Sequence, residues 1–175
     1  MISSAFDLNL FYLKKHLILF MQNCGVCDHH RSISDQLNYE IVRTTYWVFR
    51  HHPVPAPLVG WLLLDSRRHF AGPIDFKPDE AASWGQAIQI GSALVQRLTK
   101  CDRVYAIAFG EGAHHLHLHL IPRFQVDLNT TAWAVADHYR AVSNGQRAAV
   151  ASIQIAEFVK QARLLIPSFE LYSFF

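Results

Sequence analysis

The stretch that decides the fold runs from Ala113 to Arg123 and reads Ala-His-His-Leu-His-Leu-His-Leu-Ile-Pro-Arg. In it, His115, His117 and His119 alternate with leucines. Successive side chains of a β-strand point to opposite faces, so a strand here would place the three imidazoles on one face and the leucines on the other. The leucines can pack against a core, while the imidazoles can ionise or bind metal near neutral pH. A solvated histidine face or an expression tag is the alternative, but a tag would not alternate with core leucines in mid-chain. We therefore interpret this row as a functional site.

Composition indicates one well-packed domain. The chain has 175 residues, of which 51% are hydrophobic and 17% are charged, and this excludes disorder and favours a large core or a subunit interface. A formal net charge of +2 does not indicate bulk nucleic-acid binding. Three cysteines cannot all pair: Cys24 and Cys27 form Cys-x-x-Cys, and we expect Cys101 to be a small core residue. A reducing compartment, the cytoplasm, is therefore expected.

The N-terminal segment 1–23 is expected to hold an amphipathic helix that packs on the protein. Leu8–Met21 is apolar, but Lys14, Lys15 and His16 interrupt it, so neither a membrane span nor a signal peptide fits. Asn23-Cys24-Gly25 then gives a stop signal, and we expect Cys24–His30 to form a compact loop of potential metal ligands. We expect no membrane partner.

The rest of the chain alternates predicted strands and helices. Aromatic, β-branched or apolar runs predict strands at Tyr39–Val42, Thr44–Arg50, Gly60–Asp65 and Val104–Phe109. Apolar residues at helical spacing predict helices at Ala81–Thr99, Trp133–Val142 and Gln146–Leu165. The strands are close enough in sequence for antiparallel pairing, so the expected fold is α+β with one curved sheet.

The histidine row, together with its surroundings, resembles a known family. His115–Arg123 matches the His-φ-His-φ-His-φ-φ signature of the histidine triad (HIT) superfamily, with the trailing Pro-Arg of its hydrolases. Gly60–His69 is similar to the family's Gly-x-strand segment that ends in a histidine, and Asp79–Thr99 falls where the family has its long helix. The resemblance implies a HIT-like α+β fold with an antiparallel sheet of about five strands and a long helix.

The resemblance also implies a domain organisation and an assembly. It covers residues 24–124, which would form the HIT domain. Residues 1–23 and 125–175 would add an N-terminal helix and a C-terminal helical extension packed on that domain. Family members usually pair through the long helix and a strand, so a homodimer is implied.

The activity implied by the resemblance is nucleotide hydrolysis or nucleotidyl transfer at an α-phosphate. His117 would be the nucleophile that forms a covalent nucleotidyl-histidine intermediate, and His119 would contact the phosphate and stabilise its developing charge. Backbone amides around Gly110, Glu111 and Gly112 would help to bind the phosphate. Dinucleoside polyphosphates or nucleoside phosphoramidates are the expected substrates.

A structural zinc is implied as well, because some branches of the superfamily carry one. The residues here that match its ligands in those branches are Cys24, Cys27, His69 and His115. Two thiolates and two imidazoles make a normal closed zinc site. His29 or His30 could replace His69 as a ligand.

Three positions depart from the family pattern. Glu111 and Gly112 stand where many members have Gln-Ser or Gln-Thr, so a hydroxyl is lost and a negative charge is placed near the phosphate. Trp61 stands where many relatives have histidine. After Phe49, Arg50 occupies the neighbourhood in which nucleoside-phosphoramidate hydrolases hold the ribose with an aspartate.

Two alternatives to a covalent hydrolase therefore stay open. The chain could be a zinc-stabilised nucleotide-binding or sensing module with little turnover, which the changes at Glu111 and Gly112 would permit. It could also be a hydrolase whose zinc is catalytic, with His115, His117 and His119 on one ion.

Overall fold

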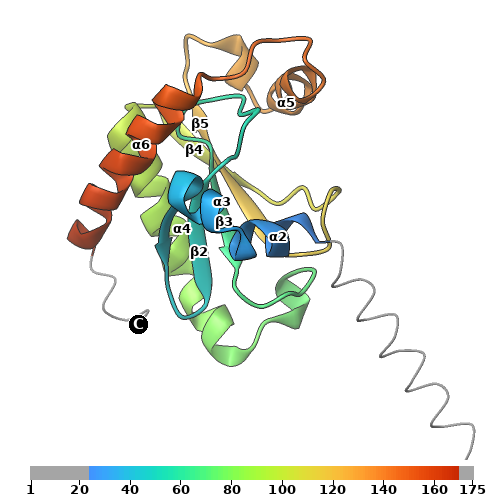
Figure 1. The fold of residues 1–175 in the computed structure, drawn as a ribbon, viewed down its shortest axis with the longest axis vertical. Coiled ribbons are helices and arrows are strands. Elements are labelled where there is room, and N and C mark those ends of the chain that lie inside the picture. Colours follow the sequence, from blue (N-terminus) through green and yellow to red (C-terminus); the bar gives the residue numbers. More distant parts are fainter. Residues whose placement is uncertain (1–23, 170–175) are drawn as a thin grey trace, which may run out of the picture.

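A single antiparallel sheet of five strands lies at the centre of the computed structural model, which describes residues 24–169 (Figure 1). Its spatial order is β1-β2-β3-β5-β4. The strands are β1 (Glu40–Arg43), β2 (Trp47–His51), β3 (Leu62–Ser66), β4 (Arg103–Ile107) and β5 (His117–Arg123). With the helices described next, this sheet confirms the predicted α+β class. The helix expected within residues 1–23 lies outside the described residues.

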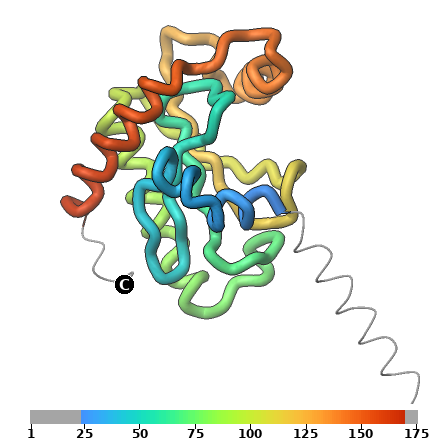
Figure 2. Tube along the Cα trace, viewed as in Figure 1, coloured from blue at the N-terminus to red at the C-terminus, as the bar shows by residue number. Residues whose placement is uncertain are grey.

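Two helices cover one face of the sheet. The long helix α4 (Pro78–Thr99) and the later helix α6 (Ser152–Leu165) contact each other, and α4 contacts β3, β4 and β5 (Figures 1 and 2). The core between these helices and the sheet is apolar, and it includes Phe49, Leu62, Leu64, Ala87, Leu94, Leu118, Leu120 and Phe158. The remaining helices are α2 (Gly25–Arg31), α3 (Ile33–Tyr39) and α5 (Val135–Ser143), with 3-10 turns at Pro73–Asp75, Leu128–Thr130 and Ile166–Ser168.

Strand register separates the leucines of β5 from its histidines. Leu118 and Leu120 lie opposite Leu64 and Leu62 of β3, and all four are buried in the core beneath α4. The residues between these leucines point to the other face of the sheet, where Leu63 lies opposite His119 and Asp65 lies opposite His117. The predicted alternation is therefore present for His117 and His119.

The third histidine does not share that row. β5 begins at His117, and His115 precedes it in an irregular segment. In that segment the backbone amide of Leu116 donates to the carbonyl oxygen of Phe70 at 2.7 Å. The prediction that three imidazoles line one strand face is thus wrong for His115. Its backbone leaves the strand, so its side chain is free to lie elsewhere.

Two further local expectations are corrected. Cys24–His30, expected to be a loop, lies largely in α2, where the amide of Asp28 bonds the carbonyl of Cys24 at 2.9 Å. The helix expected from Gln146 begins only at Ser152, because the amides of Gln146 and Arg147 turn back to the carbonyl of Ala141 at the end of α5.

Helix α5 covers the histidine face near the β4 edge. Val135 of α5 packs with Trp61 and Ile121 in a second apolar cluster, and Tyr139 packs against it. The two apolar layers thus differ in size: the layer under α4 and α6 is large, and the layer under α5 is small.

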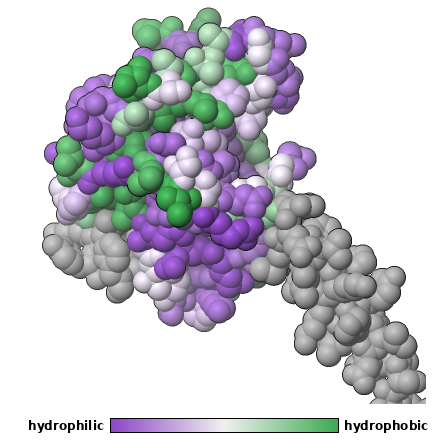
Figure 3. All heavy atoms as spheres, in the orientation of Figure 1, coloured by the Kyte–Doolittle hydropathy of each residue, from purple (hydrophilic) through white to green (hydrophobic). Residues whose placement is uncertain are grey.

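The surface in the view of Figure 1 is mixed in character. Figure 3 shows a hydrophilic lower region and hydrophobic side chains gathered around α3 and α6. The exposed apolar side chains of these two helices are Ile33, Leu37, Ile153 and Leu164. Within residues 24–169 no helix combines the length and the apolar character that crossing a bilayer requires.

Gly60→Ala should lower the free energy of unfolding by about 2–4 kcal/mol, because the cost of a left-handed backbone at alanine and the cost of overpacking add together. Gly60 has φ +80°, and a Cβ there would lie 2.4 Å from Thr99 Cγ2 and 3.1 Å from Phe158 Cε2. Gly85→Ala is the matched control: nothing lies within 4 Å of its Cβ position in α4, so it should stabilise by up to about 1 kcal/mol. Denaturant unfolding of both variants measures this, and equal effects would contradict it.

Candidate active site and metal cluster

Four side chains from distant parts of the sequence converge on one point. Cys24 caps α2, Cys27 lies in its first turn, His69 follows β3, and His115 precedes β5. One ligand atom from each lies within 4.8 Å of the others. Cys24 Sγ and Cys27 Sγ are 3.5 and 3.4 Å from His115 Nδ1, and Cys27 Sγ is 3.4 Å from His69 Nδ1. These four are the residues that the sequence predicted as metal ligands.

His115 is held in the form that a metal ligand needs. Its Nε2 lies 2.7 Å from the carbonyl oxygen of Ser66, which can only accept, so Nε2 carries the proton and Nδ1 presents a lone pair to the two sulfurs. Burial lowers the pKa of His115 to about 4, which keeps the ring neutral. A ligating histidine that donates its second nitrogen to a carbonyl is the usual arrangement around bound metals.

The thiols also point to a cation. Burial and the adjacent Cys24 thiol raise the pKa of Cys27 to about 11, because two thiolates side by side repel each other. A divalent cation among the four groups would offset that repulsion. A tetrahedral ion with Zn–S near 2.3 Å and Zn–N near 2.0 Å separates sulfur from nitrogen by about 3.5 Å, in agreement with the distances above. The donor set fits zinc.

The neighbouring histidines have other partners. His29 Nδ1 lies 2.8 Å from Asp35 Oδ2, and His30 Nε2 lies 3.0 Å from Asp65 Oδ2. It is therefore His69, and neither His29 nor His30, that the structure places in the cluster.

His117 presents one free ring nitrogen. Its Nδ1 lies 2.7 Å from the backbone oxygen of His115, so Nδ1–H donates there, and in the neutral tautomer the lone pair is on Nε2. The ring is half-buried and lines a pocket. A neutral imidazole whose second nitrogen is fixed by an acceptor is a competent nucleophile near neutral pH.

His119 is held in the opposite tautomer. The indole Nε1–H of buried Trp61 can only donate, and it lies 2.9 Å from His119 Nδ1, so the proton of His119 is on Nε2. Burial, together with the nearby His117 ring, lowers the pKa of His119 to about 3. His119 is therefore a neutral hydrogen-bond donor. Trp61, noted in the sequence only as a departure from the family, sets its tautomer.

A pocket of about 280 Å³, here called the triad pocket, adjoins both histidines. It brings His117 and His119 together with Gly110, Glu111 and Gly112, the predicted phosphate-binding residues. Its other wall comes from Phe109 and from Ala136, Tyr139 and Arg140 of α5. Sequence reasoning missed this contribution of α5, because an amphipathic pattern identifies an apolar face but not what that face covers.

A buried ion pair lies on the same face of the sheet. Asp65 Oδ2 accepts from Arg50 Nε at 2.5 Å and faces His30, so although burial alone would raise it, Arg50 and His30 hold the pKa of Asp65 well below its usual value. Arg50 Nη1 and Asp65 Oδ1 are buried and have no hydrogen-bond partner among residues 24–169. Arg50, the residue after Phe49, is therefore bound to the carboxylate of Asp65 on the neighbouring strand.

Comparison with known proteins shows the fold. The sequence matches no family model and no curated protein. The structure is similar to that of a histidine triad protein from Bradyrhizobium japonicum, with 22% identity, a TM-score of 0.57, and coverage of 77% of this chain and 96% of that one. It is also similar to a zinc-bound histidine triad family protein from Mycobacterium smegmatis, with 14% identity, a TM-score of 0.55, and coverage of 75% and 87%. The fold of this chain is that of the histidine triad proteins.

Replacing Trp61 should change the tautomer of His119. In the parent protein, ¹⁵N spectra should show an Nε2–H ring that stays neutral as the pH falls to about 4, because its pKa is about 3. Trp61→Phe removes the donor to Nδ1, so the Nδ1–H tautomer should appear and the pKa of His119 should rise. Trp133→Phe is the control, because that indole is 93% exposed. Identical His119 signals in the parent protein and in Trp61→Phe would contradict this assignment.

Proposed function

We propose that this chain, which has the histidine triad fold, is a nucleotide hydrolase or nucleotidyl transferase that acts at an α-phosphate through His117. One observation carries the proposal: His117 lines the triad pocket while its Nδ1 is bound to the carbonyl of His115, an arrangement that leaves Nε2 as the nitrogen with the lone pair in the neutral ring. Dinucleoside polyphosphates and nucleoside phosphoramidates are the substrate classes that such a nucleophile would serve.

In the proposed reaction, His117 Nε2 attacks the α-phosphorus and the bond from phosphorus to the leaving group breaks. The leaving group departs with the electron pair of that bond, and a nucleotidyl-histidine remains. Water then attacks the same phosphorus, releases the nucleoside monophosphate and returns the lone pair to Nε2. Transfer to another acceptor would replace the water.

The other pocket residues would stabilise charge on the phosphoryl oxygens. His119 would donate from Nε2–H, and the backbone around Gly110, which has φ +70°, can approach a phosphate closely. Glu111 lines the same pocket and opposes a bound anion, so its carboxylate would have to turn away from the phosphate.

The metal cluster would hold a structural zinc through Cys24, Cys27, His69 and His115. Bound there, zinc would supply a cross-link between α2, the end of β3 and the start of β5. His115 would then serve twice, because its side chain binds the metal while its carbonyl orients His117.

The sequence also leads us to propose domain boundaries and an assembly. We propose a HIT domain at 24–124, an extension at 125–175 that packs on it, and a homodimer that uses α4 and β4. In support, β4 is an outer strand of the sheet as described. A cytoplasmic location rests on cysteine usage alone.

One alternative function has an observation in its favour. The carboxylate of Glu111 beside the phosphate site would slow attack on an anionic substrate, which favours a binding or sensing module. A catalytic zinc on the three triad histidines is disfavoured: His115 Nδ1 faces the cysteines, and Nδ1 of His119 accepts from Trp61.

His117→Gln should abolish turnover of a dinucleoside tetraphosphate. Without the ring nitrogen no covalent intermediate can form, so label from an α-³²P substrate should no longer appear on protein quenched at alkaline pH as an alkali-stable, acid-labile phosphoramidate. His29→Gln, a change of the same kind outside the pocket, should leave both signals intact. Turnover that survives in His117→Gln would refute covalent catalysis. Binding without turnover in the parent protein would favour the sensing module.

Protein purified without chelator should contain about one equivalent of zinc per chain, because the four ligands make a closed site. Cys24→Ser and Cys27→Ser should lose the metal and lower the unfolding temperature, whereas Cys101→Ser, also buried but outside the cluster, should keep it. Elemental analysis and thermal unfolding measure both effects. Metal-free parent protein would refute the zinc site. Loss of turnover on mild chelation with the fold intact would favour a catalytic metal.

A further inference from the structure

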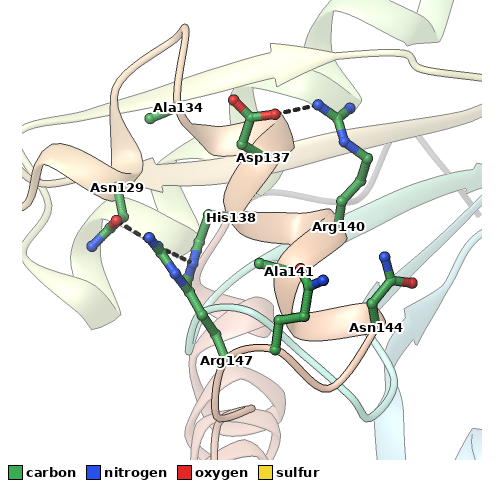
Figure 4. A pocket seen from close by; sticks show the side chains of 9 residues that line it. Asn129, Ala134, Asp137, His138, Arg140, Ala141, Asn144 and Arg147 are labelled. Carbon is green, nitrogen blue, oxygen red and sulfur yellow. Dashed lines mark hydrogen bonds and ion pairs between the residues drawn. The ribbon is translucent and has the colours of Figure 1, made fainter.

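A second cavity, of about 540 Å³, lies along α5 next to the triad pocket, and we call it the α5 cavity (Figure 4). Its lining consists mostly of polar side chains from α5 and the flanking turns: Asn129, Ala134, Asp137, His138, Arg140, Ala141, Asn144, Gln146 and Arg147. Arg140 of α5 lines both this cavity and the triad pocket.

Positive charge in the α5 cavity is only partly neutralised. Arg147 Nη1 lies 2.6 Å from Asn129 Oδ1 and 3.3 Å from His138 Nδ1, and both acceptors are neutral (Figure 4). His138 is fixed as an acceptor there, because its Nε2 lies 3.3 Å from the carbonyl oxygen of Pro57. Asp137 is the one carboxylate in the lining, and it pairs with Arg140.

These groups suit phosphate oxygens. Two guanidinium groups and the amides of Asn129, Asn144 and Gln146 can all donate, and arginine forks match phosphate geometry. The ion pair between Arg140 and Asp137 is exposed, with side chains 65% and 72% accessible, so it is weak and can be exchanged for a ligand.

Resting on the proposed function, we propose that the α5 cavity is a subsite for the distal phosphates of the leaving group. The polyphosphate chain of a substrate attacked by His117 would pass Arg140 and end against Arg147. This assigns the substrate class: a nucleotide with an extended polyphosphate, such as a dinucleoside polyphosphate. A nucleoside phosphoramidate carries no phosphate beyond the one that is attacked, so it would leave the cavity empty.

Binding of inorganic tripolyphosphate tests the subsite without turnover. Titration calorimetry on the full chain should show binding to the parent protein and to His117→Gln, weakened about tenfold or more by Arg147→Gln and less by Arg147→Lys, which keeps the charge but loses the fork. Lys160→Gln is the control, because it removes the same charge from the exposed face of α6. Equal affinities in the parent protein and Arg147→Gln, or no binding to the parent protein, would overturn the subsite.

Kinetics then separate this proposal from the proposed function. Arg147→Gln should raise KM for a dinucleoside tetraphosphate about tenfold or more and leave the KM of a nucleoside phosphoramidate unchanged. An equal rise in KM for both substrates would show that Arg147 has a merely structural role and would overturn the proposal. Thermal unfolding checks that the variant is folded. Absence of turnover with either substrate would refute the enzyme, while the calorimetry would still decide whether the cavity binds polyphosphate.

Discussion

The chemistry of this protein depends on one constraint: each histidine of the triad has one ring nitrogen already bound to a fixed partner. The partners are the carbonyl of Ser66 for His115, the carbonyl of His115 for His117, and the indole of Trp61 for His119. Two partners only accept and one only donates, so the three rings are set in defined tautomers. Burial keeps His115 and His119 neutral by lowering their pKa values. These tautomers suit the three roles proposed for residues of one type within five positions: metal ligand, nucleophile and hydrogen-bond donor.

The backbone connects the metal cluster to the nucleophile. His115 leaves the regular strand, and this lets its ring reach Cys24 and Cys27 while its carbonyl still accepts from His117. The buried pair of Arg50 and Asp65 supports the same region, since Asp65 lies opposite His117 and also binds His30 in α2.

Sequence alone predicted the α+β fold and singled out residues that the structure brings together, because both depend on local pattern. Leucines alternating with histidines predict a strand with two different faces, and the spacing of Cys24 and Cys27 predicts a pair of thiols that could bind one metal ion. What sequence could not supply depends on packing between distant segments. The position of α5 over the histidine face, the partner of Arg50, and the bond from Trp61 to His119 each require knowledge of which strands are neighbours. The helical form of residues 25–31 was missed for a local reason, since glycine and cysteine suggest a loop.

Trp61 has a consequence for how protons can move. A histidine at this position could give or take a proton, and the pair could then pass one through the ring of residue 119. An indole nitrogen has no lone pair for this purpose and does not release its proton in the physiological range. In the proposed function His119 would donate a hydrogen bond to a bound phosphoryl group, but Trp61 could not return a proton to its ring. No proton can therefore be relayed through Trp61 and His119. A leaving group that needs a proton must obtain it from solvent or from another residue of the site.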